Sequence, residues 1–119
     1  MTWRTEFAAD AERDFELIFD HLLEACESFG EPRAAAFDKA VQRLEGIRRT
    51  AEGIARAPCR GTRREDIAPG LRHVTIDRAI FWFDLDEAVK TVRILAVFFG
   101  GQDHMKHMLR RLLGGSSTT

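Results

Sequence analysis

The residues of this chain best suited to metal binding are His104 and His107, which lie three positions apart near the C-terminus. On a helix this spacing points two imidazoles toward one side, where they could share a metal ion. No third ligand is evident in the surrounding sequence, and Asp103 is better placed as the N-cap of the helix that follows. We therefore interpret the pair as surface histidines at a helix start, and we predict neither a metal nor a cofactor.

Two further groups could support catalysis. Cys59 lies in a basic stretch that favours a thiolate, and His73 precedes Asp77 and Arg78, with which it could form an acid–base group beside a phosphate. No histidine is paired with Cys59 in the pattern, and His73 fits better as a strand residue next to a polar turn. We therefore expect no catalytic residue in this chain.

Charge is distributed unevenly along the chain, although the formal net charge is only −1. Residues 1–57 carry 8 Lys and Arg against 12 Asp and Glu, whereas residues 58–119 carry 10 against 7. A basic half favours an acidic partner surface or nucleic acid. Five cations fall within 19 residues and belong either to a solvated loop or to a contact with an acidic partner or DNA: Arg60, Arg63, Arg64, Arg72 and Arg78.

The stretch Thr91–Phe99 is apolar at nearly every position, which predicts a strand covered on both faces. Strict alternation places Val92, Ile94, Ala96 and Phe98 on one face and the residues between them on the other. Gly100 and Gly101 then break the strand. A short amphipathic helix follows until Gly114, with four apolar residues at helical spacing: Met105, Met108, Leu109 and Leu112.

The N-terminal half predicts a short strand at 3–7 and two long helices at 9–29 and 32–54, because the apolar period changes from two to about 3.6 residues. With only Gly30 and Glu31 between them, the helices must form an antiparallel hairpin. The outer face of the second helix carries charged residues that include Arg43 and Arg49. Residues 58–70 read as a loop, 71–75 and 79–84 as strands that form an antiparallel meander with Thr91–Phe99, and 114–119 as a disordered tail.

These elements predict an α+β fold with one domain at residues 1–113: a two-layer arrangement in which an antiparallel sheet packs on an α-helical hairpin in β-α-α-β-β-β order, followed by a short C-terminal helix. That helix is too short to hide the opposite sheet face, so we expect exposed apolar surface there, which marks a protein interaction site. No apolar run approaches the ~20 residues of a membrane span and the N-terminus has no signal core, so we expect a cytoplasmic protein.

The same element order and three stretches resemble the ParE branch of the RelE/ParE toxin superfamily. Residues 11–14 (AERD) are similar to the Ala-x-x-Asp that opens the first helix, 77–83 (DRAIFWF) to the basic-aromatic strand, and 92–103 to the closing strand. The closing strand of the family usually ends in His-Gly-Arg-Arg-Asp. Here Gly101 and Gln102 occupy the positions of the Arg-Arg pair, and the chain contains no tyrosine.

The resemblance implies a toxin of a type II toxin–antitoxin module. RelE members cut mRNA in the ribosome with basic residues and a C-terminal tyrosine, whereas ParE members lack that set and poison DNA gyrase, so the departures imply a non-enzymatic gyrase inhibitor. The alternatives are a RelE-type ribosome-dependent endoribonuclease, in which Arg72, His73 and Arg78 replace the missing groups, or a decayed toxin that only binds antitoxin.

The implied partner is a ParD-like antitoxin whose amphipathic helix lies in the groove between the helical hairpin and the sheet, in a hetero-oligomer of two or more copies of each chain. DNA gyrase is the implied target, with DNA contacted only indirectly through antitoxin or gyrase. The residues expected to contact a partner are Arg72, Arg78, Trp82, Phe99, Met105, Met108 and Arg110.

Overall fold

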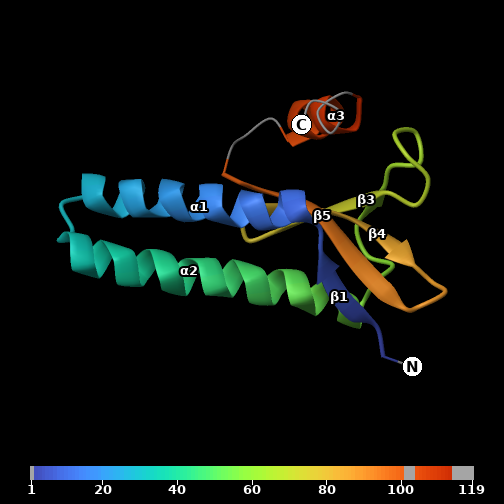
Figure 1. The fold of residues 1–119 in the computed structure, drawn as a ribbon, viewed down its shortest axis with the longest axis horizontal. Helices are drawn as coiled ribbons and strands as arrows, with labels where there is room; N and C mark the ends of the chain where they lie inside the picture. Colours follow the sequence, from blue (N-terminus) through green and yellow to red (C-terminus); the bar gives the residue numbers. More distant parts are fainter. Residues whose placement is uncertain (1, 101–103, 114–119) are drawn as a thin grey trace.

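The computed structural model describes residues 2–100 and 104–113 of the chain, so Asp103 and the tail at 114–119 lie outside the described residues. The predicted order of helices and strands is confirmed (Figure 1). One short strand lies within the segment predicted as a loop. The elements are β1 (Arg4–Phe7), α1 (Ala9–Ser28), α2 (Arg33–Gly53), a 3-10 turn η1 (Ile54–Arg56), β2 (Thr62–Arg63), β3 (Arg72–Ile76), β4 (Ala79–Asp86), β5 (Thr91–Phe99) and α3 (His104–Leu113).

The five strands form one sheet in the order β1-β5-β4-β3-β2. Strands β3, β4 and β5 make the predicted antiparallel meander, and β2 adds to the edge of β3. Strand β1 pairs with β5 in parallel, so the sheet is mixed rather than wholly antiparallel. A parallel pair needs a long crossover connection, and the helical hairpin is the first part of one. The predicted α+β class is confirmed.

Helices α1 and α2 lie side by side as the predicted antiparallel hairpin, and their sheet-proximal ends cover one face of the sheet (Figure 1). Gly30 in the connection has a φ of +88°, which glycine adopts without steric cost. The apolar stripes of the helices and the strands form one large core on this face. Its largest buried members are Phe15, Ile54, Phe81, Phe83, Ile94 and Val97.

The strict alternation predicted for β5 is wrong beyond Ile94. The pairing between β4 and β5 skips one residue at Leu95, because Phe83 lies opposite Ile94 whereas Trp82 lies opposite Ala96. Such a β-bulge resets which face the following side chains occupy. Val97 therefore joins Ile94 in the helix-side core, and Ala96 packs on the opposite face.

The expectation that the opposite sheet face stays exposed is also wrong. Trp82 is 0% exposed and Met108 of α3 is 2% exposed, within a second apolar cluster on that face. The segment before β3 supplies what the short helix lacks, because Leu71 is buried in this cluster and Ile67 packs against it. The domain therefore has a third layer, built from α3 and the 64–71 segment.

Candidate partner-binding site

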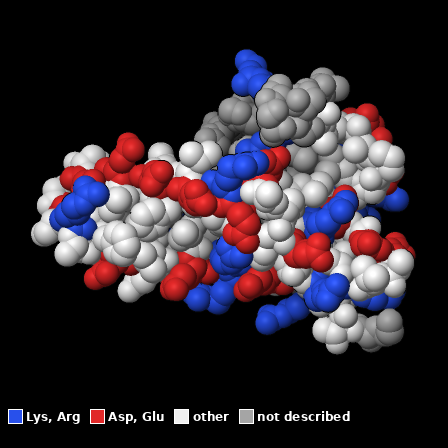
Figure 2. Space-filling model, in the orientation of Figure 1, with Lys and Arg blue, Asp and Glu red and all other residues white. Residues whose placement is uncertain are grey.

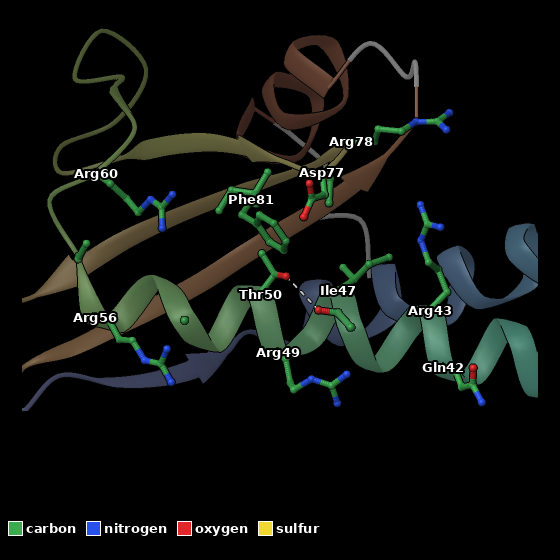
Figure 3. A pocket seen from close by; sticks show the side chains of 15 residues that line it. Gln42, Arg43, Ile47, Arg49, Thr50, Arg56, Arg60, Asp77, Arg78 and Phe81 are labelled. Carbon is green, nitrogen blue, oxygen red and sulfur yellow. Dashed lines mark hydrogen bonds between the residues drawn. The ribbon is translucent and has the colours of Figure 1, made fainter.

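Acidic side chains line α1 across the face shown in Figure 2, whereas a groove between α2 and the β3–β4 end of the sheet is cationic. The groove has a volume of about 950 Å³, and Ile47 and Phe81 contribute apolar surface to it (Figure 3). Asp77 is the acidic residue among those that line it. The cations around the groove are Arg43, Arg49, Arg56, Arg60 and Arg78.

None of these five arginines forms a salt bridge with any residue in the described part of the chain. Elsewhere the cations are mostly paired: Arg48 with Glu12 and Arg93 with Asp84, for example. Because five cations line the groove against the one carboxylate of Asp77, the groove presents a net positive field to solvent. It favours an anionic partner.

On the α2 side of the groove, two positions have no side chain that projects from the helix: Gly46 and Gly53, which lie seven residues apart on the same side of α2. A Cβ added at either would meet nothing within 4 Å, so the packing of this chain does not require glycine there. Between them, the Thr50 hydroxyl donates a hydrogen bond to the Gly46 carbonyl at 3.0 Å and so lies close to the helix (Figure 3). The groove floor therefore leaves room for another backbone to approach α2 closely.

A second pocket of about 480 Å³ lies between α1, the end of β5 and α3, and Arg78 lines both it and the groove. Its deepest polar feature is the carboxylate of Asp14, which is 3% exposed. Asp14 accepts hydrogen bonds from the Val97 N–H at 2.9 Å and from the Arg111 guanidinium at 2.9 Å. Because Arg111 lies on α3, Asp14 on α1 and Val97 on β5, these hydrogen bonds link the three elements. The hydrogen bond with Asp14 also raises the pKa of Arg111.

Sequence reasoning missed this ion pair, although Asp14 closes the AERD segment that carried part of the family resemblance. The available signal was an acidic residue one position before Phe15 in the apolar stripe of α1. The cation that neutralises it is 97 residues away, so sequence spacing could not supply the partner.

The predicted contact residues divide between several places in the structure. Arg78 and Phe99 lie together at the end of the groove, with the Arg78 guanidinium 5.8 Å from the ring centroid. Arg72 instead donates a hydrogen bond to the Cys59 carbonyl at 2.9 Å. Trp82 and Met108 are buried on the opposite face, so a partner would reach them only after α3 had moved; Arg110 is exposed on α3, and the side chain of Met105 lies outside the described residues.

The catalytic and metal groups considered from sequence are not assembled in the described residues. His73 packs on Trp82, with ring centroids 4.6 Å apart, whereas Asp77 and Arg78 line the groove on the other face of the sheet. No cluster of three metal-ligating side chains occurs in the described ranges, and the side chains of His104 and His107 are outside them. No described helix has the length and apolar character needed to cross a bilayer.

No protein-family model and no curated protein matches this chain. Among solved structures, a chain of the chromosomal ParDE toxin–antitoxin system from P. aeruginosa superimposes with a TM-score of 0.63 and 18% identity, covering 83% of this chain and 97% of that one. The RelBE2 toxin–antitoxin complex from Mycobacterium tuberculosis gives 0.54 and 18%, covering 83% and 99%. The chain has the ParE/RelE toxin fold. The resemblance predicted from the sequence is thereby confirmed at the level of the fold.

Proposed function

We propose that this chain is the toxin of a type II toxin–antitoxin module and that an acidic antitoxin segment neutralises it by binding in the cationic groove. The observation that carries the proposal is the set of five arginines without an ion pair in the described residues, on a ParE/RelE toxin fold. Guanidinium groups bind carboxylates in a planar, bidentate manner. A partner rich in Asp and Glu would compensate charges that the chain itself leaves uncompensated.

A helix is the best-fitting form for that segment. Along α2 and η1 the groove extends from Arg43 to Arg56, a span of roughly 20 Å at about 1.5 Å per residue, which about four turns of a second helix would cover. Small residues at a helix surface allow two helix backbones to approach closely, and Gly46, Thr50 and Gly53 provide such a surface. Acidic residues on the edges of the bound helix would then face the arginines of both walls.

For the cellular target, we propose DNA gyrase, inhibited by binding rather than by catalysis. Support comes from the chemistry of the chain: it contains no tyrosine, and its His73 lies on the opposite sheet face from Asp77 and Arg78. Cleavage of RNA needs a proton acceptor and cations at one phosphate. The competing function is RelE-type cleavage of mRNA on the ribosome, and a chain that has lost toxicity but still binds antitoxin is the third.

The deciding experiment is controlled expression followed by two biochemical assays. We expect growth arrest, rescue by co-expression of the adjacent small reading frame, and purification of a stable complex of the two chains. Purified toxin should trap gyrase in cleavage complexes while mRNA stays intact. Cleaved mRNA with unaffected gyrase would support the ribonuclease function. Normal growth without the antitoxin, together with a stable complex when the antitoxin is present, would support the decayed toxin.

The location of the antitoxin can be tested separately by charge reversal in the groove. Arg49→Glu together with Arg56→Glu should weaken antitoxin binding by at least tenfold, because both guanidiniums are exposed and line the groove. The matched control is Arg13→Glu with Arg33→Glu, which makes the same change in net charge on exposed helix positions away from it. Equal losses in the two double variants would place the antitoxin elsewhere.

A further inference from the structure

The turn between β3 and β4 is held in a conformation that its second central residue, Arg78, disfavours. Ile76 pairs with Ala79, so Asp77 and Arg78 form a two-residue connection, and their φ angles are +50° and +71°. Both central residues of such a turn need positive φ, which is why Asn-Gly is the preferred sequence there. Arginine in this region carries a steric cost that glycine does not. The strain would disappear with an ordinary pair of turn residues.

The side chain that this turn positions lies in an unusual electrostatic setting. The guanidiniums of Arg78 and Arg43 lie 5.8 Å and 5.6 Å from the centroid of the same ring, Phe99. Both arginines are exposed, and neither forms a salt bridge with any described residue. Two like charges on one aromatic ring repel each other unless an anion lies between them. Backbone support is also present, since the Gly100 N–H donates to the Arg78 carbonyl at 3.1 Å.

Arg78 also joins the two cavities of the molecule. Of the residues that line the groove and the second pocket, Arg78 belongs to both sets in the described structure. A chain that leaves the groove along the sheet end therefore meets Arg78 first and then the second pocket, where Leu17 is 65% exposed. The two cavities therefore border the same strained turn, one on each side of Arg78.

We propose that Arg43, Phe99 and Arg78 form a carboxylate clamp for the antitoxin, and that the antitoxin segment continues over the strained turn into the second pocket. This inference rests on the proposed function, and it adds a defined anchor and a route beyond the groove. The turn keeps arginine at a positive φ because the clamp needs its guanidinium at the junction. An ordinary Asn-Gly turn would fold better and bind worse.

The first test replaces the turn. In the full chain, Asp77→Asn with Arg78→Gly should raise the urea midpoint of unfolding and weaken antitoxin binding at least tenfold, measured by calorimetry with the product of the adjacent reading frame. Lys90→Gly is the matched control, because Lys90 also has a positive φ, +50°, and lies outside both cavities. It should raise the midpoint as well, with affinity within threefold of wild type.

The second test probes the route. Leu17→Glu places a negative charge in the second pocket at an exposed position and should weaken the same complex at least fivefold, whereas Val89→Glu, at a 55% exposed site away from both cavities, should not. Unchanged affinity in the turn variant overturns the clamp, and unchanged affinity in Leu17→Glu overturns the route. In either case the groove variant, Arg49→Glu with Arg56→Glu, should still bind weakly, so the proposed function would stand. A wild-type chain that binds no antitoxin overturns the inference and the proposed function together.

Discussion

The packing of α3 on α1 and β5 requires that the buried Asp14 carboxylate be neutralised, and Arg111 of α3 supplies the positive charge. Replacing Arg111 with Met should therefore release this helix. In the native chain the Asp14 carboxylate is 3% exposed and accepts hydrogen bonds from Arg111 and from the Val97 N–H. Methionine keeps the apolar stem but leaves a buried carboxylate with the backbone N–H as its remaining partner. Leaving such a charge buried costs about 3–5 kcal/mol.

The Arg111→Met variant can avoid most of this cost by releasing α3 from the sheet, and this limits the loss in the free energy of unfolding. If α3 leaves the sheet, Asp14 regains contact with water and the main loss is the burial of Met108, which is 2% exposed and contributes about 1.5–3 kcal/mol. Arg111→Met should therefore lower the free energy of unfolding by about 2–3 kcal/mol, with α3 released. Asp14→Asn should cost less, about 1–2 kcal/mol, because the amide oxygen still accepts from Val97 and Arg111 can reach solvent.

Trp82 provides a direct readout of the position of α3, because it is 0% exposed in the same cluster as Met108. In a Trp3→Phe background, Trp82 is the remaining tryptophan of the chain. Its emission should shift to longer wavelength in Arg111→Met and stay native in Asp14→Asn. The double variant should regain a native spectrum, since no buried charge remains. Urea unfolding followed by circular dichroism supplies the free energies.

Arg110→Met is the matched control for this experiment. Arg110 is exposed on the same helix and forms no salt bridge within the described part of the chain, so its loss should change stability by under about 0.5 kcal/mol and leave Trp82 unaffected. A native Trp82 spectrum in Arg111→Met, with a stability loss below about 1 kcal/mol, would refute the idea that α3 stays in place because Arg111 neutralises Asp14.

Three further predictions concern the groove, the helical hairpin and the second core. Gly46→Ala and Gly53→Ala should each add about 0.5–1 kcal/mol to stability, because neither Cβ meets a neighbour, and each should weaken antitoxin binding in calorimetry. Hydrogen bonding to Arg48 lowers the pKa of Glu12 in the folded state, so Glu12→Gln should cost under about 1 kcal/mol at pH 7 in urea unfolding. The difference should begin to shrink as the pH falls below 4.5 and vanish only below the lowered pKa of the folded state. Met108→Ala should cost about 2–3 kcal/mol and expose Trp82 to acrylamide.

The element order could be predicted because it depends on local patterns. Both long helices show an apolar period near 3.6, and Gly30 and the strand alternation fix the main boundaries. The β-bulge at Leu95 was not predictable, since an extra residue in a strand that is apolar on both faces leaves no break in the pattern. The cover on the second face depends on Leu71 and Met108 joining one cluster although 37 residues separate them, and local periodicity carries no information about such contacts.

The candidate site was predicted in part. Arg60 and Arg78 were recognised within a basic cluster, and the position of a groove between hairpin and sheet followed from the family resemblance. Arg43 and Arg49 were assigned to a solvated helix face, because a helical period separates buried from exposed positions but does not distinguish open solvent from a groove. Only the packing of the sheet end against α2 turns that exposed face into one wall of a site.

Because α3 covers the second face of the sheet, Trp82 fluorescence can report which face the antitoxin binds. If the antitoxin binds in the groove, it contacts the opposite side of the sheet from Trp82, so the emission of this residue should be unchanged on complex formation in the Trp3→Phe background. An antitoxin that instead displaces α3 would replace Met108 in the second cluster, and the spectrum would change in proportion to the complex formed. A spectral change that Arg49→Glu with Arg56→Glu does not weaken would contradict groove binding and place the antitoxin on the sheet face that α3 covers.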